Sequence, residues 1–507
     1  MPGGPARRGP RVPAHMVELK NYIGGEWTDA EGGRRIDDVN PATGEVIASV
    51  PQSTAKDVER AISVAHQTFQ HWRKVPAPKR AEIMFRVGTL LRERKEDLAR
   101  KMTREMGKVL VEARGDVQEG IDMAFYMAGE GRRAFGHTTP SELPNKFAMA
   151  VRDPIGVAGI ITPWNFPMAI PTWKTFPAIM LGNTVVFKPA TDTPMLALEL
   201  VKIFEEAGLP PGVMNLVFGS GSVAGEVLLH DDRVRLISFT GSNEVGRRVA
   251  SEAGLGLKRV SLELGGKNAV IVMDDADLDL AVDGIVWSAY GTSGQRCTAC
   301  SRVIAHEAIH QELVDRLAER VKKLRLGDGL LETTDVGPVI NHAAAQSIDG
   351  YVEIGKAEGA EMIVGGGVAK EGDLAKGSFY RPTLFVGVRP DMRIAQEEIF
   401  GPVLSVLKVK DLDEAIAVNN GVTYGLSSAI FTQDVNRVFR AIRDLESGLL
   451  YVNAGTIGAE IHLPFGGVKG TGNGHREAGI AALDFFSEWK SVYVDFSGQL
   501  QRAQIDA

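Results

Sequence analysis

Cysteine is scarce in this chain of 507 residues, which has only two, Cys297 and Cys300. Two cysteines cannot build a disulfide framework for a chain of this length, so the sequence predicts a protein of a reducing compartment, the cytoplasm. No second pair of ligands and no histidine cluster accompanies the two cysteines, so we expect no metal site. A redox-active pair is an alternative, although it would have to follow the first strand of a small βαβ unit.

Long apolar runs and an excess of basic residues are also missing. No stretch reaches the ~18 apolar residues that would span a bilayer, so we expect no membrane partner. The 57 basic and 64 acidic residues give a net charge of -7, without the basic stripe that favours nucleic acid. Residues 1–16 are rich in Pro, Gly and Arg and have the pattern of neither a signal peptide nor a transit peptide. They predict a disordered leader, with Met16 as an alternative natural start.

The length predicts two or three domains. Between residues 57 and 100, apolar residues recur at helical spacing and predict two amphipathic helices. From Gly156 onward, short apolar runs alternate with helix-like segments, which implies right-handed crossovers and parallel sheets covered on both faces. The predicted strands are 157–161, 184–187, 215–218, 236–239 and 270–272, and the helices between them include 195–206 and 223–229. A second alternating stretch, 311–409, completes the prediction of an α/β fold with two doubly wound domains.

The end of the chain has a different pattern. Val492, Val494 and Phe496 alternate with Tyr493 and Asp495, which predicts a strand with a period of two. A strand left over at a terminus can join the sheet edge of another subunit, or it can pack within its own chain. We favour the first interpretation and expect a homodimer or homotetramer.

The loop that contains Cys297 is the first of six segments whose residues could take part in catalysis or ligand binding. Gly291 and Gly294 end the helix that is predicted to run up to Tyr290, and they place Cys297 after a tight turn and near a helix start. Backbone N–H groups at such a helix end stabilise a thiolate. Taken alone, however, a free cysteine is more often a small buried apolar side chain.

Two further segments offer groups that a reactive cysteine needs. Glu263 follows an apolar strand and precedes two glycines, so its carboxylate could serve as a general base at the strand end. Asn165 lies between Pro163 and Pro167, and its amide could donate to an oxyanion. An exposed Glu and an Asn that closes a turn are the plainer interpretations of these residues.

The other three segments have features of a nucleotide site. Lys188 ends a predicted strand, and ligands of doubly wound sheets bind beyond the carboxyl ends of the strands. Two glycines bracket a strand-to-helix turn with Ser242 near the helix N-terminus, a geometry that binds phosphate. Glu398 lies two positions before Phe400, in a loop that continues with Gly-Pro. Each feature alone is also compatible with an ordinary loop.

Together, the six segments resemble the aldehyde dehydrogenase superfamily in their order and spacing. The motifs that carry the resemblance are PWNFP, FTGS, ELGGK, GQRC and EIFGP, and it extends from about Val17 to the C-terminus. It implies oxidation of an aldehyde to a carboxylic acid with NADP or NAD. It also implies a Rossmann-like cofactor domain, a catalytic domain and a small β oligomerisation segment, which we assign in that order to 17–136 with 155–265, to 266–470, and to 137–154 with 479–507.

The resemblance assigns roles to individual residues. Cys297 matches the nucleophile that forms a thiohemiacetal and then a thioester, Glu263 the general base and Asn165 the oxyanion donor, with Lys174 supporting the site. The residues matched to substrate binding are Gly458, Ala459 and Phe465. The residues matched to cofactor binding are Ile161, Thr162, Pro163, Trp164, Lys188, Thr191, Gly221, Gly225, Phe239, Thr240, Gly241, Ser242, Val245, Leu264, Gly265, Glu398 and Phe400.

Three positions refine what the resemblance implies. Glu263 favours hydrolysis to the free acid, because relatives that acylate coenzyme A usually lack it. Thr191 stands where many NAD-preferring relatives have Glu, so we expect NADP to be accepted. The Gly458–Ala459 pair resembles relatives that hold the distal carboxylate of a semialdehyde, such as 2,5-dioxopentanoate, aminoadipate semialdehyde or glutamate semialdehyde. A broad-specificity aldehyde dehydrogenase and a non-catalytic protein on the same fold are the alternatives.

Overall fold

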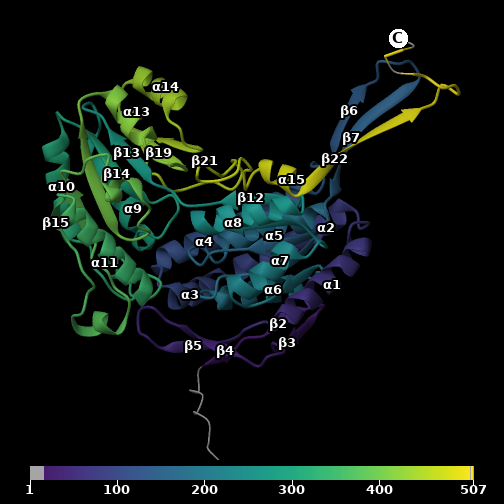
Figure 1. The fold of residues 1–507 in the computed structure, drawn as a ribbon, viewed down its shortest axis with the longest axis horizontal. Helices are drawn as coiled ribbons and strands as arrows, with labels where there is room; N and C mark the ends of the chain where they lie inside the picture. The colour runs from purple at the N-terminus through teal and green to yellow at the C-terminus, as the bar shows by residue number, and fades with distance from the viewer. Residues whose placement is uncertain (1–15, 503, 506–507) are drawn as a thin grey trace, which may run out of the picture.

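The structure, a computed structural model, describes residues 16–502 together with 504 and 505. The predicted leader, residues 1–16, therefore lies outside the described residues except for Met16. Two α/β bodies lie side by side, and a three-stranded sheet projects from one of them (Figure 1). Within the part of the chain that the structure describes, no helix combines the length and apolar character that a membrane crossing requires.

The first body is built on a seven-stranded sheet with the order β12-β11-β8-β9-β10-β2-β3. Alternate residues of its strands point to opposite faces: Val157 packs in one apolar cluster with helices, and Ala158 and Ile160 pack in another. Helices therefore cover both faces, as the continuous apolar runs predicted. The strands are β2 (Asn21–Ile23), β3 (Glu26–Thr28), β8 (Val157–Ile161), β9 (Thr184–Lys188), β10 (Met214–Leu216), β11 (Val234–Thr240) and β12 (Arg259–Glu263).

The helices of this body differ from the prediction in two places. The segment 57–100 contains parts of three helices, because the backbone at Arg94 (φ -100°, ψ 7°) interrupts the helical run. The predicted helix 223–229 begins instead as a π-helical turn, η1 (Gly221–Gly225). The helices are α1 (Ala55–Trp72), α2 (Ala77–Glu93), α3 (Lys95–Met106), α4 (Leu110–Glu130), α5 (Ala169–Leu181), α6 (Pro194–Glu206), α7 (Glu226–His230) and α8 (Asn243–Leu255).

The second body is also built on a seven-stranded sheet, with the order β15-β16-β17-β14-β13-β19-β20. All its pairings are parallel except that of β15 with β16. The run 270–272 belongs to this sheet, so the second body begins before the predicted stretch 311–409. The strands are β13 (Asn268–Val272), β14 (Cys300–His306), β15 (Glu361–Val364), β16 (Thr383–Val386), β17 (Val403–Val409), β19 (Ser427–Phe431) and β20 (Leu449–Val452).

Helices pack on this second sheet as well, and α9 ends at Tyr290, where the sequence predicted. The strong amphipathic pattern of α10 buries Leu313, Leu317 and Val321 against the sheet. The helices are α9 (Leu278–Tyr290), α10 (His310–Lys322), α11 (His342–Ala357), α12 (Arg393–Gln396), α13 (Leu412–Asn420) and α14 (Val435–Asp444). Short elements, β18 (Tyr424–Gly425), β21 (Val468–Lys469) and α15 (Ala481–Phe485), lead from this body toward the C-terminus.

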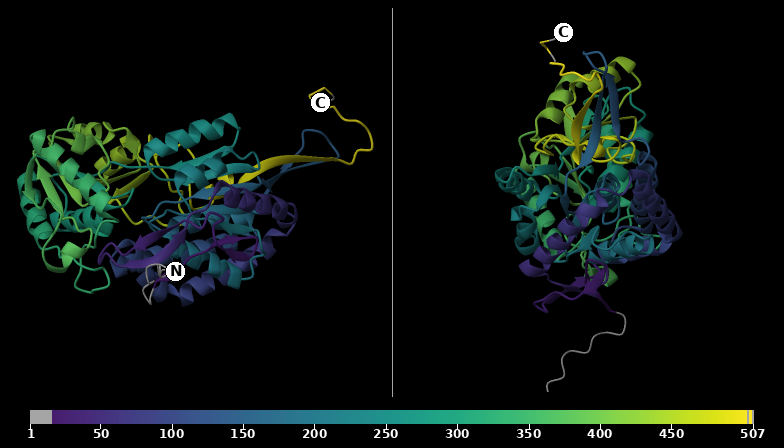
Figure 2. Two further views of the ribbon diagram at one scale, coloured as in Figure 1. Left: turned by 60° about the horizontal axis from the view of Figure 1, so that its bottom comes forward. Right: turned by 90° about the vertical axis from the view of Figure 1, so that its right-hand side faces the viewer.

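The projecting sheet consists of β6 (Gly136–Pro140), β7 (Lys146–Pro154) and β22 (Ser487–Asp495). It extends away from both bodies and carries the C-terminal part of the chain (Figure 2). The predicted C-terminal strand pairs antiparallel with β7 along the whole of β22, so it packs within its own chain. The strand order β22-β7-β6 nevertheless leaves β22 at one edge of this sheet.

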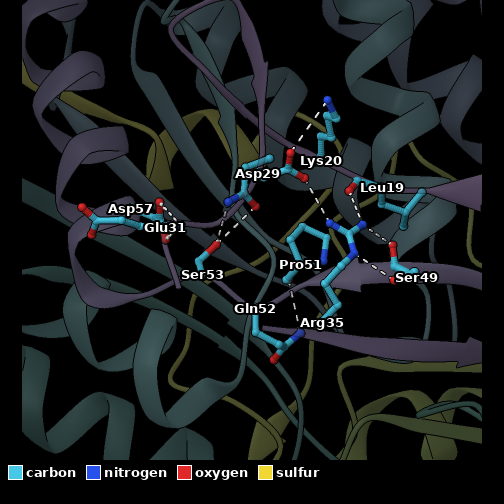
Figure 3. Close-up of polar contacts among 11 residues, drawn as sticks. Leu19, Lys20, Asp29, Glu31, Arg35, Ser49, Pro51, Gln52, Ser53 and Asp57 are labelled. Atoms are coloured by element: carbon cyan, nitrogen blue, oxygen red, sulfur yellow. Dashed lines mark hydrogen bonds and ion pairs between the residues drawn. The ribbon is translucent and has the colours of Figure 1, made fainter. Parts of the chain in front are cut away.

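A small N-terminal sheet contains β1 (Val17–Glu18), β4 (Arg35–Val39) and β5 (Val46–Pro51). Its central connection is the guanidinium of Arg35, which donates to the carbonyls of Leu19 and Ser49 at 2.7 Å each and pairs with Asp29 (Figure 3). Asp57, in the first turn of α1, completes a capping box with the N-cap Thr54 and also accepts the backbone N–H of Glu31 at 3.1 Å. These contacts attach the first described residues to the first body.

Candidate active site

Cys297 lies where two cavities meet, one with a volume of about 60 Å³ and the other of about 270 Å³. Ile170, Thr240 and Leu264 also line both cavities. The smaller one brings together Cys297, Glu263 and the three predicted substrate residues, Gly458, Ala459 and Phe465. The larger one brings together Cys297, Asn165 and predicted cofactor residues, namely Pro163, Trp164, Thr240, Gly241, Ser242, Leu264, Gly265, Glu398 and Phe400. Two molecules can therefore approach one thiol from different sides.

Cys297 itself lies in a turn between η2 (Gly291–Gly294), a tight segment with left-handed backbone, and β14. The prediction of a helix start beside it is wrong, because the turn leads directly into a strand. Burial raises the pKa of the thiol to about 12, and the carboxylates of Glu263 and Glu398 add to this effect. The N–H groups of Cys297 and Thr298 oppose it, so backbone donors are present without a helix.

Glu263 is the last residue of β12, at the strand end where the sequence predicted it. Its side chain is buried, and neither carboxylate oxygen has a hydrogen-bond partner among the described residues. Burial raises the pKa of Glu263 well above its usual value, and the charge of Glu477 raises it further, while Lys174 lowers it. The protonated form of Glu263 is therefore favoured in this arrangement.

Lys174 of α5 lies fully buried behind this wall of the cavity. Its ammonium donates to Ser238 Oγ at 2.9 Å and forms an ion pair with Glu477. A buried charge needs such a partner, because an isolated ammonium in this environment would be strongly disfavoured. Lys174 thus supports the cavity without lining it, and Glu477 connects it to the side on which Glu263 lies.

Asn165 lines the larger cavity together with Cys297, in the loop after β8. Its Nδ2 donates to the carbonyl of Gln295 at 3.1 Å, two residues before the thiol. Gln295 is itself held, since its side chain accepts the N–H of Ile340 at 2.9 Å and donates to Thr292 O at 3.2 Å. An amide nitrogen carries two hydrogens, so one N–H of Asn165 stays available to an oxygen in the cavity.

The larger cavity is bounded by a helix N-terminus and by an acidic loop. Ser242 caps α8 by accepting the N–H of Val245 at 3.4 Å, which confirms the predicted strand-to-helix turn. Glu398 accepts the N–H of Gly266 at 2.8 Å, and burial raises its pKa to about 7. Phe400 packs edge-on against Trp164, with ring centroids 5.5 Å apart.

Other predicted cofactor residues lie outside that cavity. Lys188 is buried at the end of β9, where Nζ donates to Pro189 O at 2.9 Å, and burial lowers its pKa to about 8. Gly221 and Gly225 lie in η1, and a Cβ added at either would meet no atom within 4 Å, so the backbone there is open. The remaining ones are Ile161, Thr162 and Thr191 in and after β8 and β9, Phe239 in β11, and Val245 in the first turn of α8.

The sequence did not identify several residues of the smaller cavity. Glu119 of α4, Arg296, Trp173 and Glu477 also line it. Arg296 precedes Cys297 in the GQRC motif, which is the one local signal that could have found it. The others come from distant segments. The ring of Trp173 packs against Phe465 with centroids 5.0 Å apart, and burial raises the pKa of Glu119 to about 8.

Known proteins share this architecture. Residues 27–492 match the model of the aldehyde dehydrogenase family. The chain is 42% identical over 475 residues to the alpha-ketoglutaric semialdehyde dehydrogenase of Bacillus subtilis, covering 94% of this chain and 97% of that protein. It is 40% identical over 481 residues to the glutarate-semialdehyde dehydrogenase of Pseudomonas putida, covering 95% of this chain and 98% of that protein.

Solved structures of aldehyde dehydrogenases and related enzymes are also similar to this chain. Betaine aldehyde dehydrogenase of Staphylococcus aureus, in complex with NAD+, superposes with a TM-score of 0.93 at 35% identity and covers 96% of both chains. An NADP-dependent enzyme of E. coli superposes with a TM-score of 0.91 at 37% identity and covers 94% of this chain and 98% of that one. The chain belongs to the aldehyde dehydrogenase family. It is an oxidoreductase that oxidises aldehydes with NAD(P), as the motifs predicted.

Proposed function

We propose that Cys297 is the nucleophile, Glu263 the general base and Asn165 the oxyanion donor in the oxidation of a carboxylate-bearing semialdehyde. The observation that carries this proposal is the position of Cys297 at the junction of the two cavities. An aldehyde in the smaller cavity and a dinucleotide in the larger one would both reach the same sulfur. Glu263 lines the first cavity and Asn165 the second, and Cys297 lines both.

The residues of the larger cavity fit a nicotinamide dinucleotide. The N-terminus of α8 would hold the pyrophosphate through backbone N–H groups, and Glu398 would offer a carboxylate to the nicotinamide ribose. The open backbone at Gly221 and Gly225 leaves room for the adenosine half, near Lys188. When bound, the cofactor supplies the hydride acceptor.

The protein residues then divide the reaction into two halves. Cys297 attacks the aldehyde carbon as the thiolate, after the proton of its thiol has passed to water, and Asn165 with the N–H of Cys297 stabilises the alkoxide; one such donor is typically worth about 3 kcal/mol. A thioester on Cys297 follows once the hydride has left. Glu263, after losing its proton, activates a water molecule that hydrolyses the thioester. Sulfur serves both halves because it is both a good nucleophile and a good leaving group.

The lining of the smaller cavity suits a distal carboxylate. Arg296 supplies a positive charge there, and the loop at Gly458 and Ala459 supplies backbone N–H groups. Glu119 also lies there, but with a pKa of about 8 its carboxyl is mainly neutral at pH 7 and does not repel an anion. The two relatives named for the semialdehydes of alpha-ketoglutarate and glutarate support the same substrate class.

A panel of aldehydes tests the substrate class. We expect kcat/KM for short semialdehydes that end in a carboxylate to exceed that for unsubstituted aldehydes of equal length. Two cofactors should be compared in the same assay, because Thr191 lacks the charge that would repel a 2′-phosphate, and we propose that NADP is accepted. A simple aliphatic aldehyde that is better than every acid semialdehyde would refute the first proposal. A kcat/KM with NAD more than roughly tenfold above that with NADP would refute the second.

We further propose that the projecting sheet joins subunits into a homodimer or homotetramer in the cytoplasm. Its exposed apolar side chains, including Trp489, Tyr493 and Val494, support this proposal, as does the edge position of β22. We also propose the division into a cofactor domain, a catalytic domain and an oligomerisation segment, and the presence of two large sheets and this smaller one supports it. Light scattering on the purified protein measures the assembly, and a monomer at micromolar concentration would contradict the proposal.

A further inference from the structure

The loop that precedes Cys297 contains consecutive residues with left-handed backbone. The φ angles are 51° at Thr292, 56° at Ser293 and 70° at Gly294. L residues rarely adopt this conformation, and a β-branched residue such as Thr adopts it least readily, because its Cβ crowds the backbone. Such a run persists only where surrounding contacts fix it.

Two of the three residues are fixed by the body that contains them. Gly294 packs so closely on the loop after Phe400 that an added Cβ would lie 2.1 Å from Gly401 O. The hydroxyl of Ser293 donates to the carbonyl of Gly337 at 2.7 Å. Thr292, the branched residue, is held in a different way.

Thr292 is bonded to Glu112, which lies in the first turn of α4 in the other body. One oxygen of the Glu112 carboxylate accepts the N–H of Thr292 at 2.8 Å and its hydroxyl at 3.0 Å. The other oxygen lies 3.2 Å from the guanidinium of Arg296, which also donates through Nε to Thr292 Oγ1 at 2.9 Å. The side chains of Glu112 and Arg296 are only 9% and 10% exposed, so water competes little with these charge-assisted bonds.

Arg296 connects this arrangement to the smaller cavity. It lines the cavity beside Cys297, and its guanidinium lies 5.4 Å from the centre of the Phe166 ring, another lining residue. A guanidinium held on one side by a carboxylate and on another by an aromatic face has a defined direction. Glu112 therefore acts on the cavity from outside it, through Arg296.

We propose that Glu112 is a positioning residue for both the nucleophile and the substrate. It stabilises the left-handed turn that presents Cys297, and it orients Arg296 toward the distal carboxylate of the aldehyde. The second part rests on the proposed semialdehyde function. The first part does not, because it concerns only the geometry of the thiol.

Two variants separate these parts. Glu112→Gln keeps an oxygen that can accept from Thr292 but removes the charge that holds Arg296. For this variant we expect KM for an acid semialdehyde to rise roughly tenfold, with KM for a plain aldehyde unchanged. Glu112→Ala removes all three contacts, so we expect kcat per active site and the rate of Cys297 alkylation by iodoacetamide to fall roughly tenfold or more.

The matched control is Glu96→Gln, since Glu96 also contacts two arginines, Arg100 and Arg114, but lies half exposed on the surface. We expect Glu96→Gln to leave kcat, both KM values and the rate of Cys297 alkylation unchanged. Active-site titration normalises the rates, so a loss of folded protein alone moves neither the alkylation constant nor KM.

Two outcomes would overturn the proposal. Alkylation and kcat at the control level in Glu112→Ala would mean that Glu112 does not position the thiol. If that variant does not fold, Glu112→Asp replaces it, because its carboxylate is drawn back by one methylene from Thr292 and Arg296; alkylation at the control level in that variant would rule out the positioning role equally. An equal rise in KM for both aldehyde classes in Glu112→Gln would refute its action through Arg296. If the unmodified enzyme shows no preference for acid semialdehydes, the proposed substrate class fails, while the alkylation rates still test the turn.

Discussion

Glu477 lies beside Glu263 in the wall of the smaller cavity, and its charge raises the pKa of the Glu263 carboxyl. Glu477 is also the partner of the buried Lys174, and its backbone exchanges hydrogen bonds of 2.6 and 2.7 Å with that of Phe465. One residue thus connects the proposed base, its buried counter-charge and the wall that faces the substrate. The pKa of Glu263 therefore depends on Glu477, a neighbouring residue that has no step of its own in the proposed reaction.

Glu477→Gln should shift the pH dependence of thioester hydrolysis to lower pH. The substitution removes the negative charge that disfavours ionisation of Glu263, while the positive charge of Lys174 stays nearby and favours it. Single-turnover hydrolysis of the acyl-enzyme, measured across a range of pH, gives the apparent pKa directly. Glu460→Gln is the control, because Glu460 is an exposed carboxylate near the same cavity. A shift to higher pH, or none, would contradict the role given to Glu477.

Glu263→Gln should make the protein more stable at neutral pH. In the unfolded chain Glu263 ionises near its ordinary pKa of about 4.3, whereas in the folded protein its raised pKa keeps it protonated. Its contribution to stability is therefore complete below the ordinary pKa and is lost as the pH rises toward the folded one. Gln does not titrate, so it avoids that loss. Thermal midpoints of both proteins should agree at acidic pH and diverge above it, and a variant that is less stable at neutral pH would contradict this.

The sequence predicted where the strands end, but it did not predict which residues from distant segments meet at the cavity. Glu263, Lys188 and Ser242 lie where the alternation of apolar runs placed them, because residues at the carboxyl ends of parallel strands must gather at one edge. Glu119 and Glu477 gave no signal, because an acidic residue in a helix or loop resembles any solvated one until the fold brings it to a cavity. The raised pKa of Glu119 and the ion pair of Glu477 with Lys174 exist only in the folded chain.

The segment around Cys297 also differs from its prediction, because distant contacts determine its conformation. Two glycines correctly marked the end of α9, but a helix was expected next, and the chain instead enters β14. The left-handed run at Thr292 and Ser293 could not be anticipated, since neither residue type favours it. Glu112, in the other body, holds Thr292, and the carbonyl of Gly337 holds Ser293; the local sequence contains no record of either contact.

Cys297→Ser should abolish turnover and leave cofactor binding intact. A serine hydroxyl is a weaker nucleophile at neutral pH and a poorer leaving group, so we expect kcat to fall roughly a thousandfold or more. The quenching of tryptophan fluorescence measures binding of the cofactor in the same sample. Cys300→Ser is the matched control, because the Cys300 thiol is buried and donates to Arg302 O at 3.3 Å, a bond that a serine hydroxyl can also make. Equal loss in both variants would favour a two-cysteine redox function instead.

Gly458→Ala should weaken the binding of acid semialdehydes specifically. Gly458 has a φ of 106°, and an added Cβ would lie 3.8 Å from the Trp287 ring, so space permits the methyl group but the backbone does not favour it. Relaxation of this loop would move the N–H groups proposed to hold the distal carboxylate. Gly359 is the matched control, because it has a φ of 94° with no atom within 4 Å of an added Cβ and lies just after α11, away from the cavity. Both alanine variants should lose about 1–2 kcal/mol of stability from backbone strain, but only Gly458→Ala should raise KM for acid semialdehydes relative to plain aldehydes. If both variants change KM alike, or neither does, the Gly458 loop does not recognise the carboxylate.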